Sequence, residues 1–182
     1  APKRMLRMLQ GDVGSGKTLV ALAVMLSVVE FGAQAALLAP TEVLARQHHA
    51  SLSALLQALQ IEVGLLLGQG RTSAQKSDAS QQNQAEPPPT QRSRKATLAA
   101  MADGTLSLVV GTHALFSDTT IFKDLGLAII DEQHRFGVRQ RILLGEKGLN
   151  VDVMVMTATP IPRSLAMTAY GDLDHSQLDE KP

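Results

Sequence analysis

The sequence contains no cysteine and no tryptophan, and it has a single tyrosine among its 182 residues. Without cysteine, the chain cannot form a disulfide scaffold, a thiol nucleophile, a zinc finger or an iron–sulfur cluster. Aromatic residues make up only 3% of the chain, which excludes the base-stacking surface of typical single-strand-binding proteins. An excess of charge is absent too, because 17 basic and 17 acidic residues give a net charge of zero. This balance excludes a polybasic nucleic-acid binder but not a local basic face.

Long apolar runs are also missing. The most apolar stretch, residues 19–29, ends at Glu30 and is shorter than the ~18 residues that a membrane-spanning helix needs. No signal peptide is visible, and a hydrophobic content of 45% is typical of a soluble globular domain. We therefore expect a cytoplasmic protein with no membrane partner.

Short runs rich in Leu, Val and Ile recur along the chain, with helix-length segments between them. They predict strands at residues 5–9, 34–39, 61–67, 106–110, 127–130 and 153–157. The runs are nearly continuous rather than alternating, which is typical of parallel strands covered on both faces. This order predicts an α/β fold with a doubly wound, mainly parallel sheet and helices on both faces.

Helices are predicted at residues 19–29, 42–59 and 92–102. The second carries an amphipathic stripe of leucines with Thr41 as its N-cap, and the third ends at Gly104. Residues 69–90 break the pattern, because they are rich in Gln, Ser, Ala and Pro and include three consecutive prolines. We interpret them as a disordered surface insertion in a single domain that covers residues 1–182.

The segment after the first predicted strand fits the phosphate-binding pattern G-x-x-x-x-G-K-[ST] at every fixed position. Its residues are Gly11, Asp12, Val13, Gly14, Ser15, Gly16, Lys17 and Thr18. The glycines let the backbone curl so that successive N–H groups face a phosphate, and the following helix presents its positive end there. Lys17 can reach the β and γ phosphates, and the Thr18 hydroxyl can ligate Mg²⁺. With a strand before it and a helix after it, the pattern favours a nucleotide site over a simple glycine-rich turn.

Two carboxylates, Asp131 and Glu132, follow the predicted strand at 127–130. Ligands of open α/β sheets bind at this C-terminal edge of the strands. Asp131 is placed to hold the Mg²⁺ that bridges the phosphates, and Glu132 to orient or deprotonate the attacking water. Taken alone, the pair also fits the acidic start of a helix. Together with the phosphate loop, it favours a catalytic site in which Lys17, Asp131 and Glu132 act.

Asp131-Glu132-Gln133-His134 has the form D-E-x-H. With the phosphate loop, it resembles the first, RecA-like motor domain of superfamily 2 helicases, which are P-loop NTPases. Residues 39–42, 111–113 and 157–160 resemble motifs Ia, Ib and III of that superfamily. More narrowly, residues 11–18, 131–138 and 157–163 resemble the RecG family, bacterial ATP-dependent DNA helicases that remodel stalled replication forks and migrate branched DNA. The motor of a transcription-repair coupling factor and a non-catalytic nucleotide-binding scaffold remain the alternatives.

The resemblance implies further roles for individual residues. Gln133, His134, Thr157 and Thr159 would couple the hydrolysis site to the rest of the motor. The residues that would contact the DNA backbone without reading sequence are Pro40, Thr41, Thr112 and His113. The alternative interpretation is that these four residues only shape the loops in which they lie.

The resemblance also implies ATP and Mg²⁺ as cofactors, and DNA and a second motor domain of the same protein as partners. It implies a monomer in the bacterial cytoplasm, associated with the nucleoid. The second motor domain and the DNA-wedge domain are expected outside these 182 residues. The second domain of such a motor supplies arginine fingers worth roughly 10³-fold or more in rate. We therefore expect this chain alone to bind nucleotide weakly and to hydrolyse it very slowly or not at all.

His48 and His49 are adjacent on a predicted helix, so their side chains point about 100° apart and cannot share one metal ion. With no cysteine to assist, a zinc site is disfavoured. We expect these histidines at the surface or near DNA.

Overall fold

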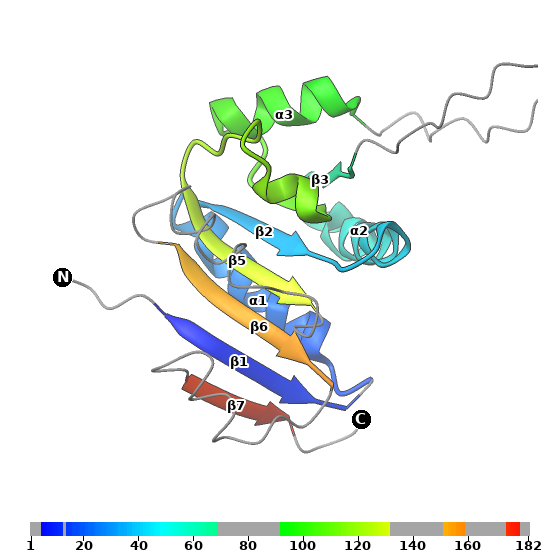
Figure 1. Ribbon diagram of the computed structural model, residues 1–182, viewed down its shortest axis with the longest axis vertical. Helices are drawn as coiled ribbons and strands as arrows, with labels where there is room; N and C mark the ends of the chain where they lie inside the picture. The colour runs from blue at the N-terminus through cyan, green and yellow to red at the C-terminus, as the bar shows by residue number, and fades with distance from the viewer. Residues whose placement is uncertain (1–4, 13, 69–91, 132–150, 159–173, 179–182) are drawn as a thin grey trace, which may run out of the picture.

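The computed structural model describes residues 5–12, 14–68, 92–131, 151–158 and 174–178. Within these ranges, the chain forms one parallel sheet of seven strands in the order β3-β4-β2-β5-β6-β1-β7. The strands are β1 (Leu6–Gly11), β2 (Gln34–Leu38), β3 (Val63–Leu66), β4 (Leu108–Gly111), β5 (Leu125–Asp131), β6 (Asp152–Thr157) and β7 (Asp174–Leu178). Figure 1 shows the arrowheads of β2, β5, β6, β1 and β7 pointing toward the same edge of the sheet.

Helices cover both faces of the sheet, as predicted. One face carries α1 (Lys17–Glu30) and α2 (Glu42–Leu56), which is continued by the 3-10 helix η1 (Gln57–Leu59). The other face carries α3 (Arg94–Asp103) and the 3-10 helix η2 (His113–Phe116). The chain crosses the sheet from β1 through β2 to β3 and then returns through β4 to β5. Because crossovers between parallel strands are right-handed, this reversal places the two sets of helices on opposite faces.

The central strand β2 shows why residues 35–38 are apolar at every position. Ala35 and Leu37 are buried in the core beneath α1 and α2, whereas Ala36 and Leu38 are buried beneath α3 and η2. Successive side chains of a strand point to opposite faces, so a strand covered on both sides needs apolar residues at every position.

The ends of the helices agree closely with the predictions. Thr41 is the N-cap of α2, and its Oγ1 accepts a hydrogen bond from the Leu44 N–H at 3.3 Å. Gly104 ends α3 in the left-handed conformation with a φ of 82°. The remaining bounds of α1 and α3 differ from the predicted ones by one or two residues, which is the ordinary uncertainty of helix ends.

The edge strand β7 is absent from the sequence predictions. Four of its five residues are polar and the strand is largely exposed, so it has no apolar run. It pairs in parallel with β1, and Arg7 Nη1 on β1 donates to Ser176 Oγ at 2.9 Å. A polar edge strand of this kind disfavours edge-to-edge aggregation.

A buried side-chain amide joins three parts of the core that lies beneath α3 and η2. The Gln34 side chain is 4% exposed, and its Nε2 donates to the backbone oxygens of Met101 (2.9 Å) and Leu106 (2.8 Å). Its Oε1 accepts from the Asp124 N–H at 3.0 Å. Gln34 therefore connects the start of β2 to the end of α3 and to the segment before β5.

Residues 69–91 lie outside the described residues, so the insertion remains a prediction. The segments that flank the insertion, at the end of β3 and before α3, are held together by side-chain hydrogen bonds. Arg92 donates from Nε and Nη2 to the Glu62 carboxylate at 2.5 and 2.7 Å, and Arg94 Nη1 donates to the Leu67 carbonyl oxygen. No helix in the described part of the chain has the length and apolarity of a transmembrane span.

Candidate nucleotide site and nucleic-acid edge

The phosphate loop joins β1 to α1. Gly11 is the last residue of β1, and α1 begins at Lys17. Gly14 and Gly16 have φ angles of 84° and 83°, in the left-handed region that residues with a Cβ rarely adopt. A Cβ at Gly11 would collide with Ser15 Oγ. The glycines predicted from the pattern are therefore required by the backbone path of the loop.

The start of α1 offers unpaired hydrogen-bond donors to an anion. Its N-cap, Gly16, has no side chain to cap the first turn, and that turn contains no acidic residue. The Ser15 hydroxyl is buried without a hydrogen-bond partner in the described part of the chain. Because the N–H groups and the positive end of the helix dipole are left without a counter-charge, a phosphate group suits this position.

Lys17 brings a positive charge to the loop. Its Nζ donates to the carbonyl oxygens of Gly11 at 2.6 Å and Asp12 at 2.7 Å. An ammonium group has three N–H donors, so these two bonds leave one for a phosphate oxygen. Thr18 follows in the first turn of α1 and is half-buried. Val13 lies outside the described residues.

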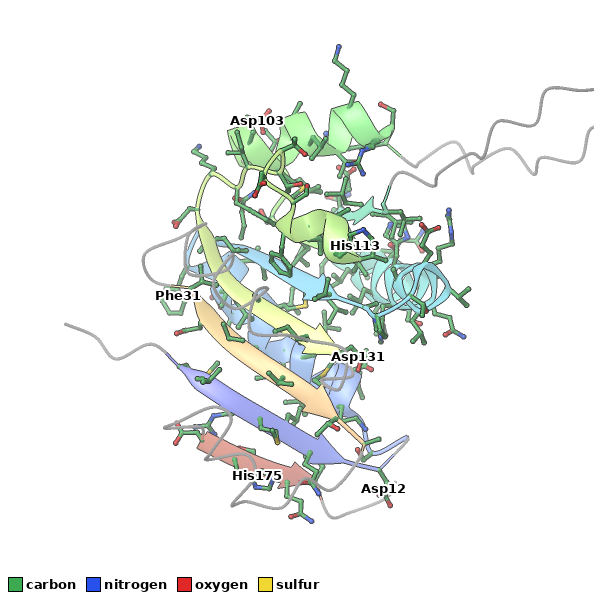
Figure 2. The ribbon with its side chains drawn as sticks, in the orientation of Figure 1. Asp12, Phe31, Asp103, His113, Asp131 and His175 are labelled. Atoms are coloured by element: carbon green, nitrogen blue, oxygen red, sulfur yellow. The ribbon has the colours of Figure 1, made fainter. Side chains whose placement is uncertain are left out.

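Asp131 ends β5 at the same edge of the sheet as the phosphate loop. Only β6 separates β5 from β1, so the two strand ends are roughly 10 Å apart at the usual strand spacing. The side chains of Leu127 and Ile129 face α1 and α2, and by strand alternation the side chain of Asp131 points to that face too. Figure 2 shows Asp131 and Asp12 along the edge where the strand arrows end.

The expectation that His48 lies at the surface is wrong. Its Nε2 lies 2.7 Å from Asp131 Oδ2, and both side chains are only 15% exposed. His49 points elsewhere, and its Nε2 lies 2.9 Å from the Val63 carbonyl oxygen. The two histidine side chains therefore point to different partners, as predicted, and His48 belongs to the candidate site. Its contact depends on the packing of α2 against β5, for which the sequence carries no local signal.

The residues present fit a Mg²⁺ ion bound together with phosphates. No group of three or more His, Asp or Glu residues in the described part of the chain forms a metal cage. Mg²⁺ is usually held by one or two carboxylates, water and the phosphates of its substrate, rather than by a cage made entirely of protein. Asp131 and the Thr18 hydroxyl, beside an uncapped helix start, match that type of site.

A second cluster forms at the ends of β2 and β4, which are neighbours in the sheet. The Ala39 N–H donates to the Gly111 carbonyl oxygen at 2.8 Å, so the segments that follow these strands lie side by side. The residues in those segments are Pro40 and Thr41 after β2, and Thr112 and His113 after β4. The structure therefore brings together the four residues assigned to DNA contact.

Two features of this cluster suit a backbone phosphate. His113 and Thr41 are exposed, and Thr112 Oγ1 is buried without a hydrogen-bond partner among the described residues. His113 also lies close to Gly68, which follows β3. A Cβ added to Gly68 would be 3.2 Å from Cε1 of His113. Figure 2 shows His113 along the same side of the molecule as Asp131.

Of the residues assigned to coupling, the structure describes Thr157. It is the last residue of β6, is 1% exposed, and pairs in register with Gln10 of β1. It therefore lies on the strand between the phosphate loop and Asp131. Glu132, Gln133, His134 and Thr159 lie outside the described residues.

Comparison with known proteins identifies the class to which this fold and site belong. Residues 3–168 match the DEAD/DEAH box helicase family, and the chain belongs to that family. It is 48% identical over 185 residues to the ATP-dependent DNA helicase RecG of Pasteurella multocida, covering 100% of this chain and 24% of that relative. It is 50% identical over 178 residues to RecG of Acidithiobacillus ferridurans, covering 98% of this chain and 23% of that relative.

A solved structure points to the same helicase. The structure of RecG bound to a three-way DNA junction matches with a TM-score of 0.73 and 40% identity, covering 100% of this chain and 22% of that one. These matches confirm the predicted resemblance to RecG and the RecA-like fold. The chain spans about a quarter of the length of the curated relatives.

Proposed function

We propose that this chain binds ATP with Mg²⁺ and forms the ATP-binding half of a RecG-type DNA helicase motor. One observation carries the proposal. The phosphate loop after β1 and Asp131 at the end of β5 lie at the same edge of the sheet, separated only by β6. The membership of the helicase family and the similarity to RecG support this function over a non-catalytic scaffold and over a coupling-factor motor.

The roles of the residues follow from their positions. The loop N–H groups and the start of α1 would hold the phosphates, and Lys17 would place its charge on the β and γ oxygens. Thr18 and Asp131 would hold the Mg²⁺, which neutralises charge that develops on the transferred phosphate. Glu132 would orient or deprotonate the attacking water.

The cluster of Pro40, Thr41, Thr112 and His113 would contact the DNA backbone. Hydroxyl and backbone groups position a protein on DNA without reading its sequence, which suits an enzyme that acts on many sequences. The relative solved with a three-way junction supports branched DNA as the substrate. Remodelling of stalled forks in the bacterial cytoplasm, at the nucleoid, fits that substrate.

The complete motor would place ATP between this domain and a second motor domain of the same protein. Four residues would couple the hydrolysis site to that domain: Gln133, His134, Thr157 and Thr159. The second domain would also supply the arginine that stabilises the transition state, so we expect the whole protein to act as a monomer. The present chain would then bind nucleotide with little turnover.

Binding of a fluorescent ATP analogue, with and without Mg²⁺, tests the proposal. Lys17→Ala removes the cation in the loop and should weaken Mg²⁺-dependent binding by tenfold or more. Lys95→Ala removes an exposed lysine on α3 as a matched control and should bind like the wild type. Equal affinity of the wild type and Lys17→Ala would refute the site, provided that circular dichroism shows both variants folded.

A further inference from the structure

The contact between His48 and Asp131 joins two elements that are distant in sequence. His48 lies in the middle of α2, and Asp131 is the last residue of β5. The atoms Nε2 and Oδ2 are 2.7 Å apart, and each side chain is 15% exposed. This is an ordered, largely water-excluded contact at the edge where the nucleotide site lies.

The direction of the hydrogen bond follows from the chemistry of the two groups. An ionised carboxylate only accepts, so His48 Nε2 carries the hydrogen and donates it to Oδ2. The bond restricts the rotation of the Asp131 carboxylate, and Oδ1 makes no hydrogen bond to another of the described residues. A carboxylate that ligates a metal is commonly held in this way by a neighbouring donor.

The position of His48 is well defined by its surroundings. Ala45, one turn earlier on α2, is completely buried against the sheet, and Leu52, one turn later, is 1% exposed. These anchors fix the rotation and height of α2 relative to β5. The backbone of His48 cannot move away from β5 without disturbing the packing of Ala45 and Leu52.

We propose that His48 is a positioning residue that holds Asp131 in the orientation that binds Mg²⁺. This inference rests on the proposed function, because it takes Asp131 as the ligand of the ion. His48 does not touch the nucleotide or the metal in this account, and it acts only through the Asp131 carboxylate. Removal of such a partner typically weakens metal affinity by roughly 10–100-fold.

Two substitutions of similar size separate positioning from packing. His48→Leu keeps a side chain of comparable volume but removes the hydrogen-bond donor. His48→Gln keeps an N–H donor at the end of a side chain of similar length. The neighbouring substitution His49→Leu is the matched control, because it removes a histidine hydrogen bond to the Val63 carbonyl oxygen on the same helix.

The readout is the Mg²⁺ concentration that gives half-maximal enhancement of binding of a fluorescent ATP analogue. His48→Leu should raise this midpoint by roughly tenfold or more, while binding in EDTA stays unchanged. The midpoints of His48→Gln and His49→Leu should stay within about threefold of the wild type. Circular dichroism and thermal unfolding of each variant confirm that it is folded.

Three results would overturn the proposal. The midpoint of His48→Leu could equal that of the wild type, the midpoint of His49→Leu could rise as much as that of His48→Leu, or His48→Gln could be as impaired as His48→Leu. Failure of the proposed function looks different, because the wild type itself would then show no Mg²⁺-dependent binding. If His48→Leu does not fold, His48→Ala removes the same donor and takes its place, and a wild-type midpoint in His48→Ala would overturn the proposal.

Discussion

Gly14 and Gly16 hold the phosphate loop in its shape through their backbone angles rather than through contacts. Both have φ near 84°, and a Cβ on either residue would meet no atom within 4 Å. Space is therefore available for a side chain, and only the left-handed backbone opposes one. Glycine is therefore required at these two positions by the backbone conformation and not by a lack of space for a side chain.

Gly16→Ala should lower the free energy of unfolding by about 1–2 kcal/mol, the usual strain of a side chain in this conformation. Gly32→Ala, at the other end of α1, is a matched control, because Gly32 has a φ of 85° and equally open surroundings. Urea unfolding should show similar losses in both variants, whereas nucleotide binding should weaken only in Gly16→Ala. Equal nucleotide affinity in the two variants would contradict the role of the loop.

Gln34 shows how one buried polar residue can connect several elements. Its amide makes three hydrogen bonds to backbone atoms of Met101, Leu106 and Asp124. Gln34→Leu would leave those backbone groups buried and unpaired, so we expect a loss of about 3 kcal/mol in the free energy of unfolding. Gln47→Leu, at an exposed position on α2, should change stability by less than about 0.5 kcal/mol. Chemical denaturation measures both, and a loss for Gln34→Leu as small as that of the control would contradict this account.

At the scale of the elements, the strands were predictable where they are buried on both faces. The runs at 35–39 and 127–130 are apolar at every position because β2 and β5 lie in the middle of the sheet. Thr41 and Gly104 marked helix ends by their chemistry alone. β7 was not predictable, because its polar residues become a strand only through pairing with β1.

Some features of the candidate site were likewise predictable from local sequence, and others were not. The phosphate loop and Asp131 follow from local patterns, because the backbone path and the strand end are encoded by adjacent residues. The partnership of His48 with Asp131 depends on how α2 packs against β5, across 83 positions of sequence. Local patterns contain no information on such a contact.

The base of the predicted insertion should respond to pH. The Arg92 guanidinium donates hydrogen bonds to the Glu62 carboxylate and holds the pKa of Glu62 below its ordinary value. A carboxyl whose pKa is lowered by folding stabilises the protein above its unfolded pKa, and this contribution is lost as the pH falls through the folded pKa. The pair is largely exposed, so its contribution is at most about 1 kcal/mol.

Glu62→Gln should therefore be less stable than the wild type by up to about 1 kcal/mol at pH 7, and the difference should vanish near pH 3. High salt should shrink it, since the ion pair is accessible to solvent. Urea unfolding at the two pH values measures this difference. A difference that persists unchanged at low pH would show that Glu62 acts through packing instead.

At the scale of the whole molecule, contacts among the described residues join the two segments that flank the predicted insertion. The ends of β3 and the start of α3 are joined by Arg92 with Glu62 and by Arg94 with the Leu67 carbonyl oxygen. Deletion of residues 73–89 should therefore shift the melting temperature by less than about 4 °C, because shortening a closed loop changes stability by less than about 1 kcal/mol. Differential scanning calorimetry would detect a fall of 10 °C or more, which would show that the segment packs on the domain.

The central claim is that this chain carries one half of an ATP-hydrolysing cleft. The most direct test measures Mg²⁺-dependent ATP binding and steady-state ATP turnover in the same samples of the chain. We expect saturable binding that requires Mg²⁺, with turnover far below the roughly 10 s⁻¹ of a typical enzyme. Absence of Mg²⁺-dependent binding would contradict the nucleotide site, and turnover at an ordinary enzymatic rate would contradict the claim that the cleft needs a second domain.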